Sequence, residues 1–186
     1  MSTKDIVYTA LFAAIFAVLG IIPPIPLPFS LVPITAQSLG PTLAGSILGA
    51  KRGALAALLF IIIVSTGLPI IAGGHGGIGR IMGPTGGFIL GFPIAAFIIG
   101  LLFEKNWNRL NLVWAALYII LGGIIVLYIF GLLWLNILFD IQLYKAFVAS
   151  CIFIPGDLIK TMIAATASMV VRRAYPLIRP LSKRNC

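Results

Sequence analysis

Charged residues are scarce in this chain: 13 lysines and arginines and four acidic residues make up 9% of its 186 positions. Soluble globular domains usually carry about a quarter charged residues. Apolar residues account for 61% of the sequence, and the mean hydropathy is +1.15. This composition excludes a soluble globular domain and indicates a membrane protein. Because a spanning helix needs about 20 residues, the chain length allows about six spans and no soluble domain beside them.

The residue types that support most catalytic chemistry are also few. The sequence has one histidine, His75, and two cysteines, Cys151 and Cys186, with no spacing typical of a metal site. It contains no GxxxxGK[ST], HExxH or GxSxG motif. We therefore expect no disulfide, no metal, no cofactor, no ATP hydrolysis and no enzymatic activity.

The basic residues lie between or beyond the hydrophobic runs, which is typical of membrane topology rather than of nucleic-acid binding. Cytoplasmic loops of membrane proteins hold the excess lysine and arginine. With alternate loops on opposite sides, one side carries Lys4, Lys51, Arg52, Lys105, Arg109, Arg172, Arg173, Arg179, Lys183 and Arg184. The other side carries Arg80 and Lys145, and Lys160 falls inside a span. We therefore expect both termini in the cytoplasm.

The apolar runs predict an all-α membrane protein, with residues 1–186 forming a single domain of six transmembrane helices. The helices are expected at about residues 6–22, 34–50, 53–68, 88–103, 110–135 and 144–171. Lys51 and Arg52 would form a tight turn between the second and third helices.

Two unusual loops are expected on the outer side. Five prolines between Pro23 and Pro33 exclude a helix there, since proline lacks an N–H and has a restricted φ. Residues 73–87 include eight glycines and are too flexible for a regular helix. These loops could close over a ligand. Thr35, Gln37 and Arg80 would supply polar groups, and the backbone at Gly73 and Gly74 could approach the ligand closely.

Asp157 and Lys160 are the most informative charges. They lie three residues apart inside the last apolar run, on one face of a helix. Each ion costs about 2.5–3.5 kcal/mol near the middle of a bilayer, so both must face protein, a cavity or a ligand. Pro155 and Gly156 weaken the helix beside them, as in the discontinuous helices of transporters. The pattern favours a binding site, and a structural ion pair beside a proline kink is the alternative.

The first apolar run carries a stripe of small residues at helical spacing, which lets another backbone come close. The stripe consists of Ala10, Ala13, Ala14 and Ala17. From the pattern alone it could pack within this chain or against another subunit.

Four strings in the sequence resemble the BioY family of bacterial biotin transporters. They are Val32-Pro33-Ile34-Thr35-Ala36-Gln37, Ala72-Gly73-Gly74-His75-Gly76-Gly77, Gly83-Pro84-Thr85-Gly86-Gly87-Phe88 and Ile154-Pro155-Gly156-Asp157-Leu158-Ile159-Lys160. The resemblance covers nearly the whole chain in the same order. The chain departs from the family at Phe88, where Tyr is more frequent, and at Arg80.

The resemblance implies the fold of a substrate-binding S component of an energy-coupling factor (ECF) transporter, in a bacterial plasma membrane. Such a component captures biotin from outside and associates with a transmembrane T component and two cytosolic ATPases, which accounts for the missing nucleotide motif. The alanine stripe resembles the AxxxA motif that contacts the T component. A homo-oligomer stays an open alternative, as do an S component for another small vitamin and a membrane enzyme or channel.

Biotin has ureido N–H groups that suit Asp157. Lys160 suits either the ureido oxygen or the valerate carboxylate, and Gln37 and Thr35 could complete the polar set. The resemblance thus predicts a small apolar pocket with a few polar groups.

Overall fold

A computed structural model describes residues 2–27 and 31–178 of the chain. The expectations that concern Pro28, Arg179, Lys183, Arg184 and Cys186 lie outside these described residues. Within them the elements are helices, and β pairing is limited to two isolated bridges, Ile25 with Ile34 and Ile71 with His75.

The helices follow the apolar runs. Their bounds are α1 Thr3–Ile21, α2 Leu39–Leu48, α3 Ala50–Ser65, α4 Ile78–Ile81, α5 Gly86–Lys105, α6 Leu112–Ile120, α7 Leu127–Phe139, α8 Leu143–Ser150 and α9 Ile154–Ala174. The 3₁₀ turn η1 (Trp107–Arg109) precedes α6, the π-helical turn η2 (Leu121–Val126) joins α6 to α7, and the 3₁₀ turn η3 (Cys151–Phe153) joins α8 to α9. Four continuous stretches of the described chain are long and apolar enough to cross a membrane: Thr3–Ile21, Gly86–Lys105, Leu112–Phe139 and Leu143–Ala174.

The second helix begins at Leu39, later than the expected residue 34. Ile34 is held instead in extended backbone, because it exchanges two hydrogen bonds of 2.9 Å with Ile25 across the proline-rich loop. Gly49 alone separates α2 from α3. Lys51 and Arg52 therefore lie in the first turn of α3 and not in the connecting turn.

The other expected bounds also shift. The glycine-rich segment, residues 73–87, contains the short helix α4, whereas no helix was expected there. Gly86 and Gly87 belong to α5. The helix expected at 110–135 continues to Phe139 and includes a π-turn, and the one expected at 144–171 is interrupted by η3. Pro155 lies in the first turn of α9, where its missing N–H has no helical partner to lose.

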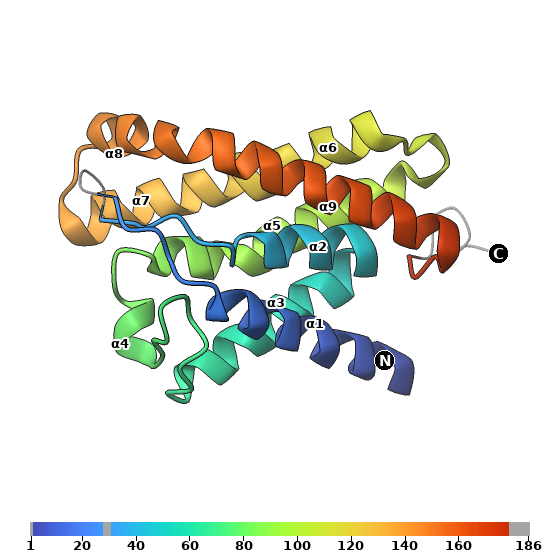
Figure 1. Ribbon diagram of the computed structural model, residues 1–186, viewed down its shortest axis with the longest axis horizontal. Helices are drawn as coiled ribbons and strands as arrows, with labels where there is room; N and C mark the ends of the chain where they lie inside the picture. The colour runs from blue at the N-terminus through green and yellow to red at the C-terminus, as the bar shows by residue number, and fades with distance from the viewer. Residues whose placement is uncertain (1, 28–30, 179–186) are drawn as a thin grey trace.

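Figure 1 shows that α1 begins and α9 ends at the same end of the molecule, with the α2–α3 turn and the start of α6 also at this end. The opposite end holds α4, the proline strap (residues 22–27 and 31–38) and the turn between α7 and α8. The structure therefore brings the proline strap and the glycine-rich segment to one end, as the charge pattern predicted.

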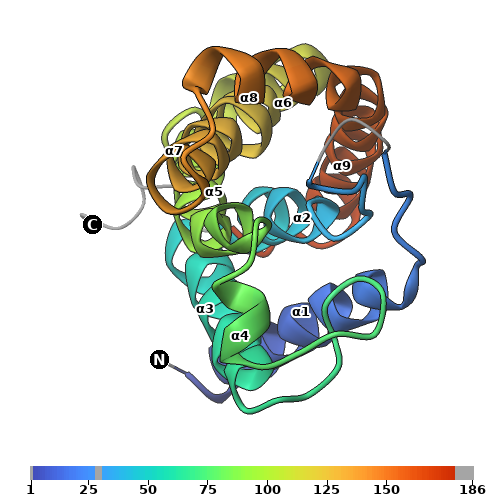
Figure 2. The ribbon, with the colours of Figure 1, turned by 90° about the vertical axis from the view of Figure 1, so that its left-hand side faces the viewer.

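Three apolar clusters hold the described helices together, and two of them join the long helices. In the first, the ring of Phe16 in α1 lies 5.2 Å from that of Phe60 in α3 and 5.8 Å from that of Phe92 in α5. The second cluster joins α5, α6 and α9 through buried side chains, which include Ile99 and Ala165. Figure 2 shows α2 in the centre, with α9 on one side and α3 and α5 on the other. α2 also packs against α9, and the bond from Lys160 to Ser38 places the start of α2 close to the first turns of α9.

Candidate substrate-binding site

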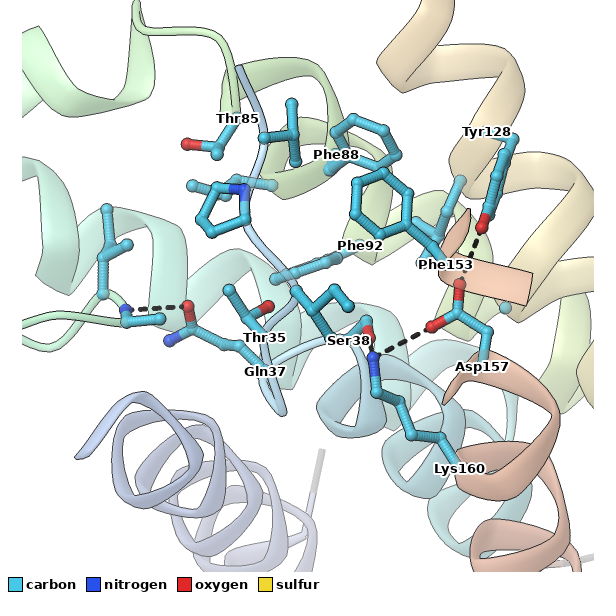
Figure 3. Close-up of a pocket in the computed structure, with 18 of the residues that line it drawn as sticks. Thr35, Gln37, Ser38, Thr85, Phe88, Phe92, Tyr128, Phe153, Asp157 and Lys160 are labelled. Carbon is cyan, nitrogen blue, oxygen red and sulfur yellow. Dashed lines mark hydrogen bonds and ion pairs between the residues drawn. The ribbon is translucent and has the colours of Figure 1, made fainter. Parts of the chain in front are cut away.

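A cavity that is partly open to the outside lies at the end of the molecule that holds the proline strap. The walls are mainly apolar and aromatic, and Figure 3 shows Phe88, Phe92 and Phe153 among them. The polar and charged side chains that line it are Thr35, Gln37, Ser38, Arg80, Thr85, Tyr128, Asp157 and Lys160.

Asp157 and Lys160 face the cavity from the first two turns of α9. The Lys160 Nζ lies 2.9 Å from Asp157 Oδ1 and 3.0 Å from Ser38 Oγ, which comes from the start of α2. The Tyr128 hydroxyl in α7 donates to Asp157 Oδ2 over 2.9 Å. The exposed fractions of the Lys160 and Asp157 side chains are 18% and 14%. The opposite charges of the two side chains cancel. Tyr128 of α7 and Ser38 at the start of α2 hold the pair at the cavity wall (Figure 3).

Arg80 lines the same cavity from α4. Its Nε is buried without a hydrogen-bond partner, and the ion pairs found among the described residues do not include it. A buried donor that lacks a partner costs about 1–3 kcal/mol. Figure 2 shows α4 and α9 on different sides of α2. The cavity therefore combines a neutral ion pair on the α9 side with a cation on the α4 side.

Gln37 lines the cavity, but its amide bonds to backbone. Its Nε2 donates to the carbonyl oxygens of Phe16 and Ile70, and its Oε1 accepts from the N–H of Ala72. The side chain is only 3% exposed. Gln37 therefore joins the proline strap, the second half of α1 and the loop before the glycine-rich segment. These bonds use the groups that were expected to contact a ligand.

Gly73 and Gly74 are exposed and do not line the cavity, in contrast to the expectation of close approach to a ligand. Their φ angles are +86° and +72°, which favour glycine. They form the turn in which Ile71 and His75 pair. This turn places Ala72 against Gln37, and Ile71 and Ala72 line the cavity instead. Thr35 lines the cavity.

Sequence reasoning missed Tyr128 and Ser38. The chain separations from their partners are 29 residues for Tyr128 and Asp157 and 122 for Ser38 and Lys160. A phenol inside a long apolar run was the one available signal, since a buried tyrosine hydroxyl usually finds a hydrogen-bond partner. No group of three or more potential His, Cys, Asp or Glu metal ligands occurs in the part of the chain that the structure describes.

The four alanines of the stripe differ in burial. Ala10 and Ala14 are exposed, whereas Ala13 is 3% exposed and packs in the first apolar cluster. Ala17 is half-buried. The stripe therefore serves packing within the chain at Ala13 and leaves a small-residue surface at Ala10 and Ala14.

The long apolar helices and the cavity they enclose define a multi-pass membrane protein with a site for a small ligand. The chain belongs to the BioY family, whose profile matches residues 1–177. This confirms the family to which the four sequence strings pointed.

Relatives match along nearly the full chain. The biotin transporter BioY of Rhizobium etli is 47% identical over 96% of this chain and 98% of its own. That of Rhodobacter capsulatus is 40% identical over 93% of this chain and 95% of its own. A crystal structure of the S component for biotin from an ECF-type ABC transporter superposes with a TM-score of 0.88 at 31% identity, over 93% of this chain and 95% of that chain. The S-component fold expected from the resemblance is confirmed.

Proposed function

We propose that this chain is the biotin-binding S component of an ECF transporter, which captures biotin at the outer face of a bacterial plasma membrane. Family membership and the likeness to a biotin S component support a transport subunit and not an enzyme. The observation that carries the proposal is the Asp157–Lys160 pair, which lies at the wall of a cavity lined by aromatic side chains. An ion pair alone would need no cavity beside it.

The charges suggest how biotin would lie. The ureido ring is neutral and has two N–H donors and one carbonyl acceptor, so it matches Asp157 together with the donors Lys160 and Ser38. The thiophane ring and valerate chain would pack against Phe88, Phe92 and Phe153. The carboxylate would pair with the Arg80 guanidinium, which lines the cavity from α4, in a charge-assisted bond.

We infer six crossings of the membrane with both termini in the cytoplasm. The stretches α2 and α3 are 10 and 16 residues long, shorter than the about 20 that span a bilayer. Extended backbone of the proline strap precedes α2, and irregular backbone is tolerated at membrane depth where protein covers it. The excess of cations beside the α1 start, the α2–α3 turn and the α9 end supports this orientation.

The transport partners would be a T component and two ATPases. The exposed pair Ala10 and Ala14 offers a close-approach surface on α1, which would suit a helix of the T component. A second copy of this chain is the alternative occupant of this surface.

The proposed function is tested by purification in mild detergent after growth with biotin, followed by mass spectrometry of the bound small molecules. We expect biotin at near one equivalent, and calorimetric titration of the ligand-free protein should show tight binding of biotin but not of thiamine or riboflavin. Asp157→Asn protein purified in parallel should carry much less biotin. Another vitamin in place of biotin would overturn the substrate assignment.

A further inference from the structure

Tyr128 makes the contact that joins Asp157 to a different helix. Its hydroxyl lies 2.9 Å from Asp157 Oδ2 and 3.4 Å from the carbonyl oxygen of Ser150. The shorter bond is to a carboxylate, and such charge-assisted bonds are stronger than bonds to neutral carbonyls. Tyr128 is also part of the cavity wall. The phenol therefore connects α7 with the charged group of α9 inside the site.

The two donors to Asp157 occupy different oxygens, since Lys160 takes Oδ1 and Tyr128 takes Oδ2. Each carboxylate oxygen can accept two hydrogen bonds, so both keep acceptor capacity toward a ligand. Lys160 has a long, flexible side chain on the same helix as Asp157. The Tyr128 ring has few rotatable bonds, and its edge packs against Phe88 with the ring centroids 6.3 Å apart. Tyr128 is thus the more rigid of the two supports.

The turn η2 explains why Tyr128 faces the cavity. A π-turn accommodates about one residue more than an α-helical turn, and one residue corresponds to about 100° of rotation. The turn ends at Val126, immediately before α7. Leu127 and Tyr128 then line the cavity, while Ile129 is 51% exposed. The π-turn therefore sets which face of α7 meets Asp157.

Close packing around η2 holds the turn in place. A Cβ on Gly122 would lie 2.3 Å from Ile99 of α5, and one on Gly123 would lie 2.5 Å from Thr42 of α2. Both distances are shorter than van der Waals contact, so the turn is seated against two helices where only glycine fits.

We propose that Tyr128 is a positioning residue for Asp157: it fixes the plane of the carboxylate so that the remaining lone pairs face an N–H donor of the ligand, and η2 sets the orientation of Tyr128. The inference deepens the proposed function and rests on it. The ligand chemistry that this arrangement favours is the edge of a cyclic urea, where an N–H donor for Asp157 lies beside a carbonyl acceptor for Lys160.

The test is a double-mutant cycle of Tyr128→Phe and Asp157→Asn, with the biotin Kd measured by calorimetry in detergent. Removal of a hydrogen bond to a charged group should weaken binding about tenfold in the Tyr128→Phe protein. In the Asp157→Asn background the same change should alter the Kd clearly less, because the phenol then bonds at most to a neutral amide oxygen and not to a carboxylate. Tyr118→Phe is the matched control, since Tyr118 packs against Phe103 and Trp114 outside the cavity. The Tyr118→Phe protein should bind biotin with the wild-type Kd.

A spectroscopic measurement separates positioning from direct contact with the ligand. The infrared difference between wild-type and Asp157→Asn proteins isolates the carboxylate stretching band of Asp157 in ligand-free protein. We expect this band at a different frequency in the second difference spectrum, which compares Tyr128→Phe protein with the double variant Tyr128→Phe, Asp157→Asn. A full tenfold effect that persists in the Asp157→Asn background, or a band that does not move, overturns the positioning role. If wild-type protein binds biotin and Tyr128→Phe binds equally well, only this inference falls, whereas absence of binding by the wild type overturns the proposed function itself.

Discussion

Lys160 Nζ stands 2.9 Å from Asp157 Oδ1, and each member of this pair has a further partner on another helix, Ser38 for the ammonium and Tyr128 for the carboxylate. A pair tied into α2 and α7 in this way cannot rotate toward lipid or solvent without breaking bonds. Its remaining acceptor capacity is directed at the cavity.

Asp157→Asn should weaken biotin binding at least about tenfold, since an amide replaces one acceptor oxygen by a donor that faces either Tyr128 or Lys160. Calorimetric titration in detergent gives the Kd. Asp140→Asn is the control: Asp140 follows α7 with φ of +55°, a conformation that asparagine tolerates well, and its substitution should leave the Kd unchanged. Equal affinities of Asp157→Asn and wild-type protein would remove Asp157 from the site.

Lys160→Ala should raise the biotin Kd clearly. The melting temperature of ligand-free protein should fall only slightly. Asp157 would keep the Tyr128 hydroxyl as a donor, so the fold is expected to persist while the ureido oxygen loses its partner. Lys145→Ala, at an exposed position of α8, serves for comparison in both measurements. A large drop in melting temperature together with unchanged affinity would instead indicate a structural ion pair.

Arg80→Gln should remove the preference for a free carboxylate. Wild-type protein is expected to bind biotin more tightly than biotin methyl ester, by about tenfold or more for a buried charge pair. In Arg80→Gln protein the two ligands should bind with similar Kd values. Arg109→Gln, whose cation lies in η1, should keep the wild-type preference. A preference that survives Arg80→Gln would assign the carboxylate to another residue.

Bulky substitutions at two neighbouring alanines of α1 should affect different properties: uptake for Ala14 and stability for Ala13. Ala14→Leu adds an exposed side chain and should leave the biotin Kd and the melting temperature unchanged while blocking uptake by the assembled transporter. Ala13→Leu overfills the core beside Phe16 and should destabilise the protein by about 1–3 kcal/mol. Uptake assays in cells that express the whole ECF complex, with thermal melts of each purified variant, check both. Normal uptake by Ala14→Leu would argue against docking at this face.

Gln37→Ala should destabilise ligand-free protein, because it leaves the buried N–H of Ala72 without its side-chain acceptor. The expected loss is about 1–3 kcal/mol. Thermal melts without biotin measure it, and Gln142→Ala at an exposed position is the control. If affinity falls while the melting temperature stays constant, Gln37 contacts the ligand and is not mainly a structural tie.

Several features of the fold could be predicted from local pattern. Apolar runs give helices because a backbone in lipid must satisfy its own hydrogen bonds, and α5 follows its run closely. The exact start of α2 could not be predicted, because Ile34 pairs with Ile25 across the strap and this pairing competes with helix formation. The π-turn was equally hidden, since it depends on the packing of Gly122 and Gly123 against α5 and α2.

The sequence by itself determined the membrane class, the family and the pairing of Asp157 with Lys160, because three-residue spacing on one helix brings two side chains together whatever surrounds them. Tertiary structure alone decided that Tyr128 and Ser38 complete this group, that Gln37 ties loops together and that Ala13 is buried while Ala14 is exposed. The physical reason is that these contacts join segments far apart in the chain. Their geometry depends on how the helices pack, and periodicity along one helix carries no information about it.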